Sequence, residues 1–247
     1  MKISIITIVY NNRETIADAI ESVLGQTYPD VEYIIVDGQS TDGTVEVIQR
    51  YGNRISKFIS ERDNGLYDAI NKGISLATGE VIGLLHSDDI FYSTESIAQV
   101  ARAFQDYHTD SVYADLLYVQ KANIAKVVRN WVSGNYKREN FLLGWMPPHP
   151  TFYVKREVYE RLGLYNTSFK SAADYELMLR YLYKHNISTI YLPEVLVRMR
   201  VGGKSNVTLK NRIRANQEDY RAWRINGLNP PFYTRFLKPL RKLVQFI

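Results

Sequence analysis

The chain has 247 residues, of which 45% are hydrophobic and 23% charged, an ordinary composition for a globular protein that buries a sizeable core. It has no cysteine, which excludes disulfides, thiolate nucleophiles and cysteine-based zinc sites and fits a reducing compartment. The net charge of +5 is uneven: residues 210–247 carry nine Lys or Arg and two acids, a charge of +7, which leaves 5 − 7 = −2 for the remainder. This placement argues against nucleic-acid binding, which favours a basic patch within the folded domain.

The first 90 residues alternate between strand-like and helix-like periodicity. The apolar run Ile3–Val9 is too short to span a membrane and predicts a first strand that is buried on both faces. Apolar residues then recur at helical spacing over 16–24, with Asn11-Asn12 as the expected cap. The same alternation predicts further strands over 31–36, 55–60 and 81–85, and helices over 45–51 and 69–77, the last ended by Gly79.

This βαβαβαβ order predicts an α/β fold with a mainly parallel sheet and helices on both faces. Ligands of such sheets bind at the carboxyl ends of the strands, so the polar loops after Val9, Val36, Ser60 and Leu85 should line one crevice. The second half is less regular. It predicts strands over 111–119, 125–128 and 188–192, helices over 94–104, 157–162 and 175–185, and a Pro-rich loop over 145–150.

We expect one catalytic domain over residues 1–200. Within it, residues 1–110 form the nucleotide-sugar-binding half and residues 111–200 the acceptor half. A basic helical tail follows over residues 201–247.

The acid pair Asp88-Asp89 directly follows an apolar strand. Adjacent acids repel each other, so a strand end is a poor place for them without a cation or hydrogen bonds. A hard divalent ion that also binds two phosphate oxygens needs only one or two protein carboxylates. The alternative is a helix cap, with Asp89 or Ser93 starting a helix at Thr94.

Asp37 ends the second predicted strand and should open into the same crevice. Its carboxylate can accept hydrogen bonds from a nucleotide base or from ribose hydroxyls, although an Asx-turn acid before Gly38 is the alternative. Asp42 fits the turn and cap role better. No Gly-rich phosphate loop follows the first strand, which argues against a dehydrogenase or a P-loop enzyme and favours metal-assisted departure of a nucleoside diphosphate.

Asp174 precedes an apolar helix face. It is either a helix-start acid favoured by the helix dipole or a general base that deprotonates an incoming hydroxyl.

Five segments together resemble glycosyltransferase family 2, which has the nucleotide-diphospho-sugar transferase (GT-A) fold. They are IITIVYNN (5–12), IIVDGQSTDGT (34–44), SERDNGLYDAINKG (60–73), ATGEVIGLLHSDD (77–89) and SAADYELMLR (171–180). The resemblance covers roughly residues 2–200.

The resemblance implies a role for each matching position. Tyr10 lies against the nucleotide base, and Asp37 hydrogen-bonds that base, usually uracil or another pyrimidine. Asp88 lies nearer the ribose or sugar, and Asp89 is the better ligand for Mn²⁺ or Mg²⁺, which Asp88 also helps to bind. Asp174 is the catalytic base. Further contacts to the donor are expected from Asp68, Asn71 and Lys72.

The chain also departs from the family pattern. His86 stands where relatives often have Asn, as either an extra ligand or sugar contact or a filler. Ser87 precedes the acid pair in place of a spaced D-x-D, which leaves open which acid binds the ion. His149 lies in a loop that resembles the family's acceptor-side segment, or is merely exposed.

The expected function is an inverting transfer of sugar from a nucleotide-diphosphate sugar, UDP-sugar first, to a hydroxyl of a lipid-linked saccharide in surface-polysaccharide synthesis. The alternatives are a sugar-1-phosphate nucleotidyltransferase, which should carry a Gly- and Arg-rich phosphate loop, and a non-catalytic carbohydrate-binding protein.

The C-terminal segment Arg235–Ile247 has apolar and basic residues at amphipathic helical spacing. Such a helix binds an anionic membrane surface, or it docks on its own domain or on a second subunit as a homodimer contact. We therefore expect a cytoplasmic enzyme with peripheral contact to the inner face of the membrane.

Overall fold

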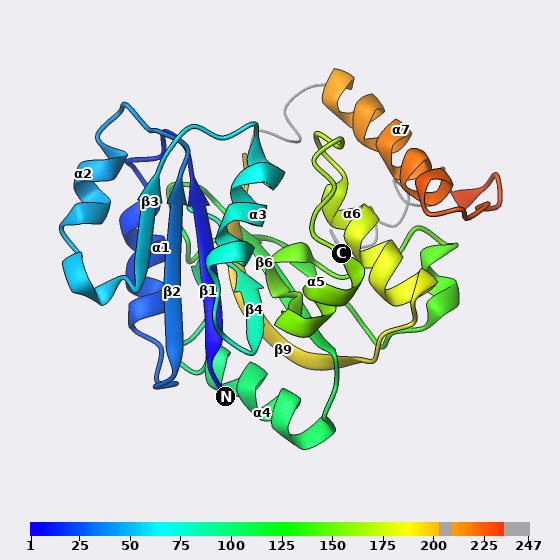
Figure 1. Ribbon diagram of the computed structural model, residues 1–247, viewed down its shortest axis with the longest axis horizontal. Coiled ribbons are helices and arrows are strands. Elements are labelled where there is room, and N and C mark those ends of the chain that lie inside the picture. Colours follow the sequence, from blue (N-terminus) through cyan, green and yellow to red (C-terminus); the bar gives the residue numbers. More distant parts are fainter. Residues whose placement is uncertain (203–208, 235–247) are drawn as a thin grey trace.

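The computed structural model describes residues 1–202 and 209–234. This part of the chain forms one curled β-sheet with helices on both sides (Figure 1). The strands are β1 (Ile3–Val9), β2 (Val31–Asp37), β3 (Lys57–Ser60), β4 (Val81–Leu84), β5 (Ile90–Phe91), β6 (Ser111–Val119), β7 (Val127–Trp131), β8 (Tyr153–Lys155) and β9 (Thr189–Arg200). Their order across the sheet is β3-β2-β1-β4-β8-β6-β9-β5, and β7 pairs with β6.

Seven α-helices and several short helical turns connect these strands within the described part of the chain. The α-helices are α1 (Ile16–Leu24), α2 (Thr44–Gln49), α3 (Leu66–Leu76), α4 (Ser96–Tyr107), α5 (Arg156–Leu162), α6 (Ala173–Met178) and α7 (Leu209–Ile225). The π-helical segment Leu179–Lys184 continues α6.

Strand β1 is buried over its whole length and separates two hydrophobic cores. Ile6 and Ile8 face one core, which also holds buried side chains of α3, α5, α6 and α7. Ile3 and Ile5 face the other, which holds buried side chains of α1, α2 and α4. A strand with side chains alternating between two cores has no polar face, which explains the continuous β-branched sequence.

The first four strands are parallel, so their carboxyl ends meet at one edge of the sheet. β1 pairs with β2 on one side and with β4 on the other, and β2 pairs with β3. The strands point upward in Figure 1, and the polar loops that follow them lie at the top.

The second half of the sheet begins where β8 pairs antiparallel with β4. Gly83 of β4 makes this contact possible, because a Cβ at that position would overlap the ring of Tyr153 in β8. Gly73 has a similar role in α3, since its Cβ would overlap Ile6 of β1. Both glycines permit a close approach that brings α3 and β8 against the central strands.

The sequence predicts most elements of the first half within a few residues, with several corrections. The predicted Asn cap of α1 is wrong: Thr15 is the N-cap and makes no side-chain cap bond. The third strand begins at Lys57, and α3 ends at Leu76 instead of Gly79.

Further corrections fall mostly in the second half. The strand predicted over 188–192 extends to Arg200, and the one predicted over 125–128 is β7. The short strands β5 and β8 were not predicted. Within the described residues no helix is long and apolar enough to cross a membrane. The predicted amphipathic segment 235–247 lies outside the described residues.

Candidate active site

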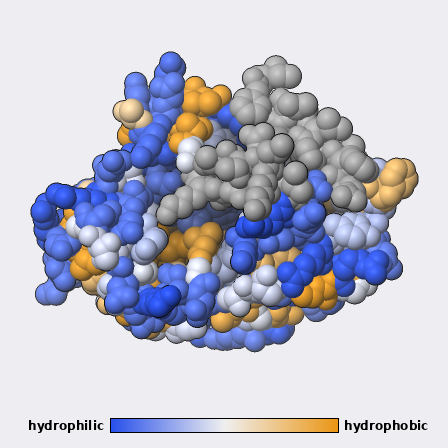
Figure 2. All heavy atoms as spheres, turned by 90° about the horizontal axis from the view of Figure 1, so that it is seen from above, coloured by the Kyte–Doolittle hydropathy of each residue, from blue (hydrophilic) through white to orange (hydrophobic). Residues whose placement is uncertain are grey.

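The candidate site lies at the edge where the parallel strands end. The register pairs Val9 with Asp37 and Asp37 with Ser60, so the first three loops start side by side. Figure 2 looks down on this edge, whose visible surface is mostly hydrophilic with smaller apolar patches. Tyr10 is 55% exposed here, as a ring that receives a nucleotide base would need to be.

Asp37 is fully buried, and neighbouring serines donate hydrogen bonds to its carboxylate. It accepts hydrogen bonds from the backbone N–H of Ser40 (3.0 Å), the Ser40 hydroxyl and the Ser60 hydroxyl (2.6 Å). The bond from the Ser40 N–H reaches three residues along the chain, so it is a local loop contact and differs from the Asx turn, which spans two residues, that the sequence offered as the alternative. A nucleotide base that binds the Asp37 carboxylate has to share it with a serine hydroxyl or displace one. The contact between Asp37 and the base therefore stays a prediction.

Asp42 makes the turn contacts expected of it. Its carboxylate accepts hydrogen bonds from the backbone N–H groups of Thr44 (3.0 Å) and Arg13 (3.1 Å). It therefore holds the start of α2 and the loop after β1 together.

Asp89 follows β4 and is fully buried, and neither carboxylate oxygen has a hydrogen-bond partner among the described residues. Burial raises its pKa well above the usual aspartate value; the neighbouring Asp88 raises it further, and Arg200 partly opposes this. The helix-cap alternative fails, because the N-cap of α4 is Glu95. A buried carboxylate without a partner carries a high desolvation penalty, which a bound cation relieves.

The acid pair fits an ion that takes its remaining ligands from phosphate and water. No group of three His, Cys, Asp or Glu side chains converges to hold a metal in residues 1–202 and 209–234. Mg²⁺ and Mn²⁺ accept this arrangement, since one or two carboxylates and the oxygens of a diphosphate suffice.

Arg200, at the end of β9, contacts the backbone of the acid pair. It is 5% exposed, donates to the backbone carbonyl of Asp88 (2.8 Å) and forms an ion pair with Asp18 of α1. No local sequence pattern marks Arg200, because its contact with the acid loop spans 112 residues of sequence.

The side chains of His86 and His149 contact each other. Their Nε2 atoms are 3.0 Å apart and their ring centroids 5.1 Å apart. Burial lowers the pKa of each to about 4, and for His86 the neighbouring His149 contributes as well. The sequence pointed to both residues separately, but nothing in it indicated that they pair.

Asp174 is the second residue of α6, and the fold brings it to the histidine pair. One carboxylate oxygen lies 3.6 Å from Nδ1 of His149, and the other accepts a hydrogen bond from the hydroxyl of Tyr67 at 3.4 Å. The side chain is 21% exposed, so it can be reached from solvent. Tyr67 belongs to α3 and stacks on Tyr165, with ring centroids 5.8 Å apart.

Asp68, Asn71 and Lys72, all on α3, organise the loops around the site. Asp68 accepts from the backbone N–H of Asn64 (2.9 Å). Asn71 exchanges two hydrogen bonds with the backbone of Tyr165, at 2.8 and 3.0 Å. Lys72 pairs with Glu61 (2.8 Å), which raises its pKa. Their contacts to a donor stay predictions.

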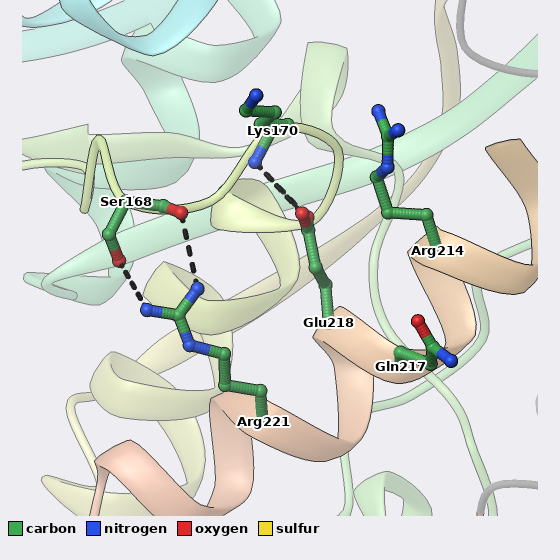
Figure 3. A pocket seen from close by; sticks show the side chains of 6 residues that line it. All are labelled: Ser168, Lys170, Arg214, Gln217, Glu218 and Arg221. Atoms are coloured by element: carbon green, nitrogen blue, oxygen red, sulfur yellow. Dashed lines mark hydrogen bonds between the residues drawn. The ribbon is translucent and has the colours of Figure 1, made fainter.

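Helix α7 packs against α6 and holds the segment that leads to Asp174 (Figure 1). Glu218, 9% exposed, accepts hydrogen bonds from the backbone N–H groups of Lys170 (3.1 Å), Ser171 (2.8 Å) and Ala172 (3.1 Å). Figure 3 shows this carboxylate beside Lys170 and shows Arg221 bound to Ser168. The Trp223 indole also donates to the hydroxyl of Tyr175 (2.9 Å).

Glu218 therefore supplies the acceptor that the short helix α6 lacks at its start, where no side chain of α6 itself forms a cap bond. In the sequence, Glu218 is marked only as one of two acids in the basic segment 210–247. A cavity of about 340 Å³ adjoins it, and its lining includes the cations Lys170, Arg214 and Arg221.

The family model described as "Glycosyl transferase family 2" matches residues 4–163. A "PGL/p-HBAD biosynthesis glycosyltransferase" of Mycobacterium bovis is 27% identical over 208 residues, covering 82% of this chain and 78% of the relative.

Two kinds of solved structure share the fold. Staphylococcus aureus TarS 1-349 in complex with UDP-GlcNAc has a TM-score of 0.70 at 20% identity, covering 92% of this chain and 65% of that one. This chain spans 39% of another, longer TarS chain. The mannosyltransferase PcManGT from Pyrobaculum calidifontis, in complex with GDP-Man and Mn²⁺, has a TM-score of 0.68 at 20% identity, covering 98% and 69%. These similarities establish the GT-A fold.

Replacing Glu218 by Gln should destabilise the protein. The amide keeps one acceptor oxygen but turns an NH₂ group toward backbone donors, so we expect a loss of about 1–3 kcal/mol in the free energy of unfolding. Urea unfolding measures it, and Glu194→Gln, an exposed acid in β9, is the matched control. Equal stability of the two variants would contradict a clamping role for Glu218.

Proposed function

Since this chain belongs to glycosyl transferase family 2 and has the GT-A fold, we propose that it transfers a sugar from a nucleotide-diphosphate sugar, UDP-sugar first, to an acceptor hydroxyl with inversion. One observation carries the proposal. The carboxylate of Asp89 is buried without a hydrogen-bond partner among the described residues, the carboxylate of Asp174 is reachable from solvent beside His149, and both carboxylates act on the phenol of Tyr118. An acid that needs a cation and an acid that can accept a proton are the two groups that a direct displacement uses.

Asp174 and Asp89 have separate roles in this reaction. Asp174 accepts the proton of the acceptor hydroxyl as that oxygen attacks the anomeric carbon. The hydroxyl of Tyr67 and the Nδ1 side of His149 hold its carboxylate in place. Asp89, with Asp88, holds the divalent ion, which when bound offsets the charge that grows on the departing diphosphate. Attack from the face opposite the leaving group inverts the anomeric configuration.

The donor half of the proposal draws on the relatives. TarS was solved with UDP-GlcNAc and PcManGT with GDP-Man and Mn²⁺. We propose that Tyr10 stacks on the base, that Asp37 contacts it, and that the ion is Mn²⁺ or Mg²⁺. The two alternative functions receive no support: no Gly-rich phosphate loop follows β1, and the family is one of transferases.

We further propose an acceptor that carries negative charge, as a lipid-linked saccharide diphosphate does. Lys170, Arg214 and Arg221 line the cavity behind the segment that leads to Asp174, and the chain ends in a basic segment.

Replacing Asp174 by Asn should abolish transfer and spare donor binding. Removing a general base lowers kcat by about 10²–10⁴-fold. The nucleotide sugar is first chosen by thermal shift among UDP-GlcNAc, UDP-glucose and GDP-mannose with Mn²⁺. Release of the nucleoside diphosphate and binding of the donor are then measured, and NMR of the transferred sugar reports its anomeric configuration.

The matched control is Asp106→Asn, an exposed acid on α4, which should keep full activity. Turnover retained by Asp174→Asn would exclude Asp174 as the base, and a retained anomeric configuration would exclude the direct displacement.

Mn²⁺ should stabilise the UDP-bound wild type and not Asp89→Asn. A ligand present at 100 times its Kd stabilises a fold by about 2.7 kcal/mol. Without metal, Asp89→Asn should be at least as stable as the wild type, because it replaces a buried acid whose ionisation carries a desolvation penalty. Thermal unfolding with and without Mn²⁺ tests both statements, and equal Mn²⁺ shifts in both proteins would remove Asp89 from the metal site.

Deleting residues 235–247 should abolish binding to anionic vesicles. Each basic residue near the headgroups contributes roughly 1 kcal/mol, and salt weakens the attraction. Sedimentation with phosphatidylglycerol and with phosphatidylcholine vesicles measures the binding. Unchanged binding would dismiss the membrane role, and a smaller species in size-exclusion chromatography would assign the segment to a subunit contact instead.

A further inference from the structure

The contact between His86 and His149 needs one shared proton. Their Nε2 atoms are 3.0 Å apart, so one ring donates an N–H and the other accepts it with a lone pair. The Nε2 that accepts carries no proton, so the accepting ring is neutral and has its single N–H at Nδ1. The choice of donor therefore fixes the tautomer of the accepting ring.

The second nitrogen of His149 decides which ring donates. Its Nδ1 lies 3.6 Å from a carboxylate oxygen of Asp174. If His149 donated from Nε2, Nδ1 would present a lone pair to this negative charge. If His149 accepts at Nε2, Nδ1 carries the proton and points an N–H toward the carboxylate. The second arrangement is favoured electrostatically, so His86 is the donor.

The other ionisable groups around the carboxylate are consistent with this choice. The Tyr67 hydroxyl donates to the second oxygen of Asp174. The pKa values of Tyr67, Tyr118 and Tyr165 are raised, in each case chiefly by burial, so these phenols stay neutral.

We propose that His86 and His149 act as a positioning relay for Asp174: the Nε2–H of His86 fixes His149 as the Nδ1–H tautomer, and that N–H orients the carboxylate of the base. The relay rests on the role of Asp174 proposed above. Neither histidine touches the reacting atoms. The 3.6 Å separation is longer than a hydrogen bond, and catalytic contacts of this kind tighten once substrate binds.

The contact between His86 and His149 follows from the pairing of β4 with β8 in the sheet. β8 runs antiparallel to β4 with Val81 opposite Lys155 and Ile82 opposite Val154. The chain just before β8 therefore returns alongside the carboxyl end of β4, where His86 lies. His149 begins the turn His149–Thr151 that leads into β8, which places its ring against that of His86.

NMR tests the tautomers without any need for activity. The chain has only four histidines, so long-range ¹H–¹⁵N correlations of the imidazoles can be assigned with single variants. We expect His149 protonated at Nδ1 only and His86 protonated at Nε2 only at neutral pH. In His86→Phe the His149 pattern should change, and in the control His185→Gln it should not. A His149 protonated at Nε2, or at both nitrogens, would overturn the relay.

Isosteric variants test its effect on catalysis. Asn at position 149 places an amide N–H close to the position of Nδ1, whereas Gln places it close to Nε2. We expect His149→Asn to keep most of kcat and His149→Gln to lose roughly 10- to 100-fold, the range for a lost hydrogen bond to a charged group. KM for the donor should not change.

At position 86 the order reverses, because only Gln carries a donor near Nε2: His86→Gln should exceed His86→Asn in kcat. Equal losses for the Asn and Gln variants at both positions would mean that the histidines only fill space. If the wild type transfers no sugar from any donor while His149 is still the Nδ1–H tautomer, the proposed function fails and the tautomer assignment stands.

Discussion

The parallel pairing of β1 with β2 and with β4 is the constraint on which the site depends. Because β1 has parallel neighbours on both sides, it lies between two cores, and the strands of this half end at the same edge. The antiparallel return of β8 beside β4 then adds a loop from the second half of the chain to that edge. The pairing of β4 with β8 needs Gly83, and the packing of α3 on β1 needs Gly73, because a Cβ at either position would overlap a neighbouring side chain.

This edge collects negative charge that the fold itself only partly compensates. Asp37 is satisfied by serine hydroxyls, and Arg200 anchors the backbone of Asp88, but Asp89 has no hydrogen-bond partner among the described residues. Burial makes the ionised form of Asp89 less stable, which raises the pKa of its carboxyl group. A bound cation would relieve this penalty, which supports the proposal that Asp89 takes part in binding a divalent ion and a diphosphate.

The sequence predicted the elements whose signals are local and missed those that depend on distant partners. β1 to β4 carry continuous apolar runs, and the acids at their ends could be read directly. β5 and β8 have two and three residues and exist only through their pairing with β9, β4 and β6.

Strand β9 extends past its predicted end at residue 192. Pro193 lies in a bulge, where the register passes from Leu192 opposite Ala114 to Val195 opposite Asp115. The bulge holds the proline where no ladder bond is needed, and the strand continues to Arg200. The His86–His149 contact and the Glu218 clamp escaped prediction for the same reason, since their partners are 63 and about 47 residues apart.

The position of Asp174 depends on a part of the chain beyond the matched family region. Helix α6 has six residues, and isolated helices of this length are unstable in water. Glu218 accepts a hydrogen bond from the N–H of its N-cap residue Ala172, and its side chains Tyr175 and Glu176 receive hydrogen bonds from Trp223 and Asn226 of the α7 region. The family match ends at residue 163, before α6 begins. Asp174, which we propose as the base, is therefore held by contacts that this match does not cover, and these contacts reach past the boundary predicted at residue 200 into α7.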